Sequence, residues 1–361
     1  METGVIKTAR YKGLDWLRGL MALAIIIGHS VCWKTGSVNV GGVTGRLLMY
    51  GVSIFFLISG LSLAARYWNK LGDPASWINF YRQRLLRIYP LLWLVVLIWA
   101  VFNAMHAPLV HAPVNFYSVF INLTGLFGFI DYNYYIAFGT WFIGNILVYY
   151  SVFPFIIALF NKSRLGGNLL FALTLAIGFA IAVFAIRPNV PLSLQWESYI
   201  NPLNNLYFFI AGIALYYDLK DVKISVIVNY LILAGNIAVF YFYPVSGDRA
   251  VIVTGINRVV FSLLAAMLTI VFWKTEFSLP GKIDRIWLEI CQASYSIYLL
   301  QPIVWVTMYL SVRSWFGNYA EFAVTAGILG LAAGLLSYRF IELPVVKLFQ
   351  GKVLIITKTD K

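Results

Sequence analysis

The sequence is poor in charged residues, which make up 11% of its 361 positions, whereas hydrophobic residues make up 61%. Soluble domains carry about 25% charged residues, so this composition excludes an ordinary soluble domain and predicts a membrane protein. Only two cysteines occur, Cys32 and Cys291, and both fall within apolar stretches without metal-ligand spacing. We interpret both as packing residues.

Several patterns that bind cofactors or perform catalysis are also missing. The sequence has no glycine-rich phosphate loop, no paired Cys or His metal pattern and no Gly-x-Ser-x-Gly nucleophile motif. We therefore expect no metal site and no tightly bound cofactor. The net charge of +13 would suggest nucleic-acid binding in a soluble chain. Here an asymmetry of Lys and Arg across a bilayer explains most of it, and we expect no nucleic-acid partner.

Stretches of about 20 apolar residues, the length that crosses a bilayer, recur about ten times. The predicted fold class is an all-α, polytopic membrane helix bundle. Its predicted spans are 14–34, 47–67, 88–105, 140–160, 168–186, 199–217, 223–243, 255–273, 291–311 and 319–341. Most of the 27 Lys and Arg residues lie on the side of the N-terminus, which predicts cytoplasmic N- and C-termini. We expect a single domain over 1–361, with short cytoplasmic tails at about 1–13 and 345–361 and no appended soluble domain.

Two further segments lie between predicted spans. Asp73 and Pro74 supply a helix N-cap and a proline at the first helical position. They predict a short interfacial helix on the inner side that ends near Tyr89 and Pro90. On the outer side, residues 106–139 are rich in aromatic residues and glycine. This segment can enter the membrane only where protein buries its backbone.

The first apolar stretch carries the strongest functional signal. A helix turns about 100° and rises about 1.5 Å per residue, so Arg18 and His29 lie within about 20° of each other and about 16 Å apart. Asp15 is placed to pair with Arg18. Such groups in an apolar span normally face a protein interior or a water-filled cavity. His29 could take a proton from a hydroxyl or carry an acyl group, and Arg18 could bind an anion. The alternatives are a helix–helix hydrogen bond for His29 and a structural ion pair for Arg18.

A second cluster combines Tyr81 with Arg82, Arg84 and Arg87. Guanidinium groups suit phosphate oxygens, which makes these residues candidates for binding an anionic substrate. The alternative is ordinary inner-side charge in contact with lipid headgroups. The spacing of two and then three places the arginines on different helix faces. We therefore expect at most two of them to contact a single ligand, unless the helix bends.

Polar and aromatic side chains inside other spans complete the candidate substrate contacts. Some of them have structural alternatives, namely close helix packing around Phe55 to Gly60 and an aromatic belt at Trp141. At the end of the tenth span, Arg339 is expected to pair with Glu342. The candidates are Ser59, Trp141, Asn145, Tyr149, Tyr295, Tyr298 and Gln301.

In this order the motifs resemble the integral-membrane acyltransferase family 3, whose members O-acetylate bacterial surface and exported polysaccharides. The matching features are LDWLR with Arg18-x10-His29, FFLISG, FYRQRLLRIYP, WFIGNILVYYSVFP, SYSIYLLQP and RFIELP. The resemblance implies a cytoplasmic acetyl-CoA donor and a lipid-linked or exported polysaccharide acceptor reached from the other side of the bacterial inner membrane. It also implies a catalytic role for His29, an essential role for Arg18 and donor contacts for residues 82–87.

The sequence departs from the family pattern at two places. Many members have glutamate in the motif that here runs from Trp141 to Asn145, and many have histidine where this chain has Gln301. If either group carries a second proton, His29 acts more alone here, because His106 and His111 lie in the outer segment. Membrane lipids are further expected partners, and the sequence predicts no oligomeric state.

The main alternative is a transporter or translocator of a lipid-linked sugar or small anion, in which the polar stripe lines a path and no bond is made. Transporters often contain repeated halves and interrupted helices, and no such repeat is visible in the sequence. A third alternative, a receptor or scaffold, gives no role to the inner arginines or to His29. For the enzyme, we expect the acyl-CoA nucleotide to stay at the inner arginines while its thin arm extends along the stripe from Asp15 to His29, where Ala22 leaves room.

Overall fold

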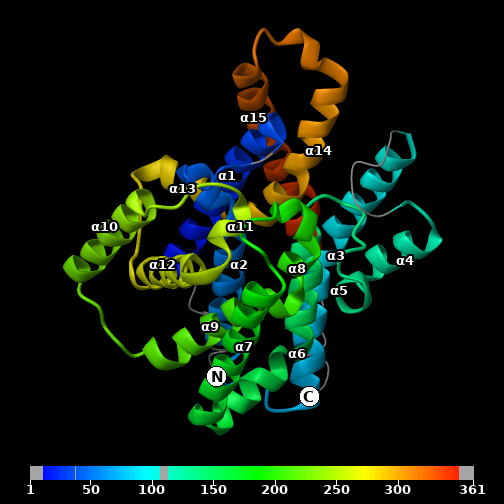
Figure 1. Ribbon diagram of the computed structural model, residues 1–361. Coiled ribbons are helices and arrows are strands. Elements are labelled where there is room, and N and C mark those ends of the chain that lie inside the picture. Colours follow the sequence, from blue (N-terminus) through cyan, green and yellow to red (C-terminus); the bar gives the residue numbers. More distant parts are fainter. Residues whose placement is uncertain (1–10, 37, 106–112, 349–361) are drawn as a thin grey trace.

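A computed structural model describes residues 11–36, 38–105 and 113–348. All regular elements within these ranges are helical, which confirms the all-α prediction (Figure 1). Eight of the described helices are long and apolar enough to cross a membrane, the last two including the turns that follow them. They are α1 (Lys12–Thr35), α2 (Val43–Tyr67), α3 (Pro74–Met105), α6 (Trp141–Lys162), α7 (Arg164–Phe184), α12 (Gly255–Lys274), α14 (Ser294–Val312) and α15 (Tyr319–Ser337).

The sixth and seventh predicted spans correspond to α9 (Pro202–Leu219) and α10 (Val226–Phe242), which are not among these eight helices. α10 has only 17 residues. α9 carries buried amides near its start, where Asn204 and Asn205 both donate to the Tyr199 carbonyl. Each of the ten predicted spans therefore corresponds to an apolar helix, and eight of these helices have the length and hydropathy of a membrane span.

The remaining helices are short connections. They are α4 (Phe116–Thr124), α5 (Phe127–Ile130), α8 (Trp196–Ile200), α11 (Arg249–Ile252), α13 (Gly281–Gln292) and the turns η1 (Leu192–Gln195), η2 (Arg313–Trp315) and η3 (Tyr338–Glu342). Part of the outer segment thus forms α4 and α5, whereas His106 and His111 lie outside the described residues.

α1 packs against five other helices, α2, α12, α13, α14 and α15. We call the end of the bundle at Lys12 the inner end and the end at Thr35 the outer end. At Gly19 an added Cβ would lie 2.5 Å from the Sγ of Cys291, so α1 and α13 approach closely there. Cys291 is buried, in agreement with a packing role.

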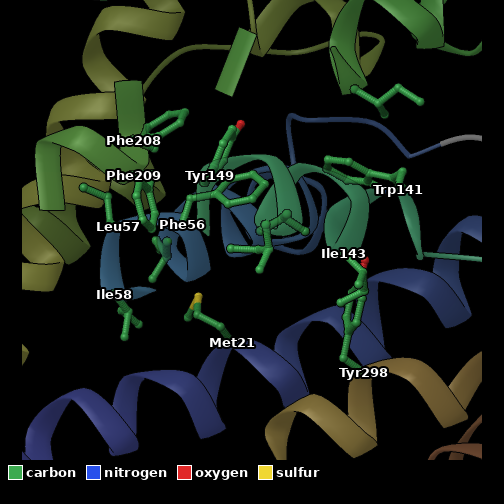
Figure 2. Close-up of a cluster of buried hydrophobic side chains, with 14 of the residues drawn as sticks. Met21, Phe56, Leu57, Ile58, Trp141, Ile143, Tyr149, Phe208, Phe209 and Tyr298 are labelled. Atoms are coloured by element: carbon green, nitrogen blue, oxygen red, sulfur yellow. The ribbon is translucent and has the colours of Figure 1, made fainter. Parts of the chain in front are cut away.

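Two glycines bring the backbones of α2 and α9 together. A Cβ at Gly60 would lie 1.9 Å from the carbonyl oxygen of Phe209, and one at Gly212 would lie 2.1 Å from that of Leu57. Small residues let apolar helices approach each other closely, which explains the FFLISG motif. Figure 2 shows the core around this contact, with Phe56 and Leu57 facing Phe208 and Phe209.

The separate interfacial helix predicted for residues 74–89 is wrong, because α3 runs unbroken from Pro74 to Met105 and includes Pro90. Proline inside a helix removes one backbone hydrogen bond and is unfavourable by about 3 kcal/mol. Packing on both sides of Pro90 offsets this loss, since Phe80, Leu92 and Val95 are fully buried. The arginine cluster therefore lies on an inner extension of the third span.

The ninth predicted span also begins too early, because the chain turns at Ala293 between α13 and α14. α13 is an amphipathic helix that runs alongside the inner part of α1. Its Asp284 pairs with Lys12 at 2.7 Å. The hydrogen bonds from Lys12 and from the Leu279 amide hold the pKa of Asp284 below its ordinary value. This ion pair ties α13 to the start of α1.

Candidate active site

A cavity of about 440 Å³ lies within the inner half of the bundle. α1, α2, α3, α6 and α14 contribute to its wall, and the η3 turn closes it. The polar and aromatic residues that line it are Tyr11, Asp15, Arg18, Phe55, Ser59, Ser62, Arg66, Arg84, Arg87, Phe142, Tyr150, Gln292, Ser294, Tyr295, Tyr298, Tyr338 and Glu342. Four arginines face two carboxylates in this wall, so the cavity suits an anion.

Arg18 occupies the deep part of this cavity. Its Nη1 lies 3.1 Å from Asp15 Oδ1, and its Nη2 donates to Ser62 Oγ at 2.8 Å. The predicted contact between Asp15 and Arg18 is therefore present. Because both residues also line the cavity, the pair holds a guanidinium at a position that an anionic or carbonyl group can reach.

Of the three clustered arginines, two line the cavity. Arg84 is buried, its Nη2 lies 3.5 Å from the Tyr67 hydroxyl, and its Nε has no hydrogen-bond partner in the described part of the chain. Arg87 lies beside it, whereas Arg82 lies outside the wall. The arrangement agrees with the expectation that at most two would meet one ligand. Tyr81 also lies outside the wall, and its hydroxyl donates to the Ser151 carbonyl.

Glu342 is buried and faces Arg87, with Oε1 3.6 Å from the arginine Nε. Its Oε2 accepts a hydrogen bond of 2.9 Å from Ser296 Oγ. The expected pair between Arg339 and Glu342 is wrong, since Arg339 instead pairs with Glu289 at 2.8 Å. The reason is the π-helical geometry of η3, which changes the direction in which Glu342 points.

The predicted face of α6 points away from the cavity. Asn145 donates to the Ile200 carbonyl and Tyr149 to the Pro202 carbonyl. Trp141 packs against Trp196. All three face α8 and α9, while Phe142, Ile143 and Tyr150 face the cavity. The period of four identified a common face of the helix, but it could not show which neighbour that face meets.

Ser59, Tyr295 and Tyr298 do line the cavity. Ser62 and Arg66 also line it and were not among the predicted residues, although they follow Ser59 in helical steps of three and four within an apolar span. That spacing is the signal which could have identified them. In the described ranges no three His, Cys, Asp or Glu side chains gather as a metal site.

His29 lies beyond this cavity, nearer the outer end. Its Nδ1 is 2.6 Å from Gln301 Nε2, and its ring stacks on Trp33 and meets the edge of Phe138. A carboxamide exchanges its donor and acceptor by a half-turn. Gln301 can therefore donate to a bare Nδ1 or accept from a protonated one. In the second case Nε2 is free to act as a base.

Phe55, Phe142 and Tyr298, which we call the aromatic layer, close the cavity on the side of His29. Phe142 lies 5.7 Å from Tyr298 and 6.1 Å from Phe55 between ring centroids. On α14, Tyr298 lines the cavity and Gln301, one turn further, contacts His29. The order is the same on the neighbouring segment, where Phe142 lines the cavity and Phe138 contacts His29.

The expected open path along α1 is therefore wrong in this structure. Ala22 and Ile25, between Arg18 and His29, are each 1% exposed and do not line the cavity. Ala22 packs with Ile297 instead of leaving room for a substrate arm.

A family model described as an acyltransferase domain matches residues 11–339. The chain belongs to acyltransferase family 3. No curated protein and no solved structure matches the chain significantly. As a family 3 acyltransferase, the protein transfers an acyl group to a hydroxyl, and its apolar helices make it a membrane protein. The matched region contains His29. It also contains the residues that line the inner cavity, except for the last of them, which follow the match.

Proposed function

We propose that this acyltransferase moves an acetyl group from cytoplasmic acetyl-CoA to a hydroxyl of a lipid-linked or exported polysaccharide at the bacterial inner membrane. The observation that carries the proposal is the order of groups along α1. Arginines surround the inner cavity, and a histidine lies beyond the aromatic layer towards the outer end.

The inner cavity supports the assignment of the donor. The nucleotide of acetyl-CoA carries several phosphates, and guanidinium groups are well suited to phosphate oxygens. Arg84 and Arg87 lie on the inner extension of α3, and Arg18 lies deeper. In this proposal the phosphates bind near α3, and Arg18 orients the thin pantetheine arm.

His29 supplies the chemistry in this proposal. As a base, Nε2 takes the proton of the acceptor hydroxyl while the hydroxyl oxygen attacks the thioester carbonyl carbon. The carbon–sulfur bond then breaks, and the leaving thiolate takes up the proton. As a nucleophile, the imidazole would instead bond to the acetyl carbon, release the thiol and then pass the acetyl group to the acceptor. Both routes require the aromatic layer to move aside during transfer.

The test is release of free thiol from acetyl-CoA by the detergent-solubilised protein, with and without a membrane glycan extract. We expect release that needs the extract and is lost, by at least about a hundredfold, in His29→Ala, since general acid–base catalysis contributes roughly 10²–10⁴-fold. Ser30→Ala, the adjacent position on α1, should retain activity. Folded protein that releases no thiol with any of several donors and extracts would favour the translocator.

A further inference from the structure

Arg249 lies at the start of α11, at the outer end of the bundle. Its guanidinium carbon lies 5.7 Å from the ring centre of Trp196, on α8. Its Nε is buried, and no hydrogen-bond partner for it exists among the described residues. A buried charged donor without an acceptor is unfavourable, so this position calls for an explanation.

Two arginines at this end that are more deeply buried than Arg249 donate to backbone acceptors. Arg46 donates to several backbone carbonyls, including those of Val40 and Tyr243. Arg258 donates to the carbonyls of Val253 and Asn204. The Nε of Arg258 has no partner either in the described part of the chain. The difference lies in the rest of the guanidinium, because Arg258 donates through both Nη atoms, whereas the Arg249 side chain makes no hydrogen bond within the described residues.

Neighbouring acids do not neutralise Arg249. The Oδ1 of Asp248 accepts from the backbone amides of Leu192 and Ala250, at 2.7 and 2.9 Å. Glu197 is exposed, and within the ranges described it forms no ion pair with Arg249. Burial raises the pKa of Tyr135 to about 12, so this phenol stays neutral. Arg249 therefore forms no ion pair with a carboxylate in this part of the structure.

Contacts place Arg249 on the outer side of His29, because the Val40 amide, just beyond the outer end of α1, donates to the Gly247 carbonyl, two residues before Arg249. Trp196 Nε1 donates to the Tyr135 hydroxyl at 2.9 Å, and Tyr135 belongs to the same connection as Phe138, which contacts the His29 ring. Arg249 thus lies on the side of His29 opposite the inner cavity.

We propose that Arg249, held by Trp196, is the acceptor-binding residue and binds an anionic group, a carboxylate or a phosphate, on an acidic glycan. This inference rests on the proposed function, because it assigns the acceptor to the outer side of His29. The guanidinium fork is suited to either anion. Binding there would bring a nearby glycan hydroxyl towards His29.

The test compares binding of three probes to the full-length protein in detergent: a galacturonate trisaccharide, glucose 1-phosphate and neutral maltotriose. We expect wild type to bind at least one acidic probe more tightly than maltotriose. Arg249→Gln should weaken that binding about tenfold or more, as expected for the loss of a charge-assisted hydrogen bond. Arg249→Lys should restore part of it. The matched control is Arg187→Gln, an exposed arginine at the same end, which should bind as wild type does.

The two acidic probes distinguish a sugar carboxylate from a phosphate. Equal binding of acidic and neutral probes by wild type, or an equal loss of both in Arg249→Gln, would overturn the inference. Turnover gives a second readout in which Arg249→Gln raises KM for an acidic acceptor and leaves KM for acetyl-CoA unchanged. Acid-selective binding without any acetyl-CoA turnover would reject the proposed function and keep the anion site.

Discussion

Glu342 lies at the end of a single π-helical turn. Its carboxylate points into the bundle and faces Arg87. The carboxylate is held on its other oxygen by Ser296. Arg87 itself is about half exposed, with 47% of its side-chain surface accessible. A long, partly exposed arginine has many rotamers, so a fixed carboxylate restricts where its guanidinium lies. We interpret Glu342 as a positioning residue for the arginines that the proposed function assigns to the donor.

Glu342→Gln should therefore raise KM for acetyl-CoA about tenfold, while kcat at saturating donor stays within about twofold, because uniform binding is lost and the chemical step is not touched. Initial rates of thiol release at varied donor concentration measure both constants. Glu289→Gln removes the carboxylate of the more exposed pair with Arg339 and is the matched control. A fall in kcat with unchanged KM would contradict the positioning role.

At the scale of helices, the contact between α2 and α9 depends on the absence of two side chains. Gly60 and Gly212 each leave space for a carbonyl oxygen of the facing helix. α2 also carries Ser59 and Ser62 on the cavity wall. Any separation of these two helices would move the polar side of α2 as well.

Gly60→Ala should destabilise the bundle by about 1–3 kcal/mol, as overpacking commonly does, since its Cβ would overlap the Phe209 carbonyl. The melting temperature in detergent is the measurement. The control is Gly235→Ala in α10, where a Cβ meets nothing within 4 Å. That change should be neutral or slightly stabilising, because alanine favours a helix more than glycine does. Equal melting temperatures for both variants would contradict the close approach.

At the scale of the whole molecule, the aromatic layer divides the bundle into the inner cavity and a region around His29. Phe142→Ala removes the ring in contact with both Phe55 and Tyr298. We expect thiol release without an acceptor to rise severalfold, because water then reaches the thioester from the side of His29. Phe155→Ala, on an exposed part of the same helix, should show the wild-type rate. An unchanged rate in Phe142→Ala would mean that the layer does not exclude water.

Much of this organisation could be predicted from the sequence. Apolar length identified the helices, and the spacing of Asp15 and Arg18 predicted their contact. The sequence could not predict that packing would carry α3 through Pro90, because the compensating contacts come from distant segments. The pair of Glu342 with Arg87 could not be predicted either, because a π-helical turn changes the direction in which the following side chains point. Nor could the sequence show that Ala22 would be covered by Ile297, which depends on how α1 and α14 meet.

The aromatic layer also affects whether ions can leak across the membrane through the protein. Because the inner cavity stops before His29, the described part of the bundle contains no continuous aqueous passage along α1. Protons and ions need such a passage to cross an apolar bundle. A protein divided by such a layer can open its arginines to one side of the membrane and its histidine towards the other side without letting protons leak down their gradient. In the proposed function, the aromatic layer has to open only for the acyl group and to close again behind it.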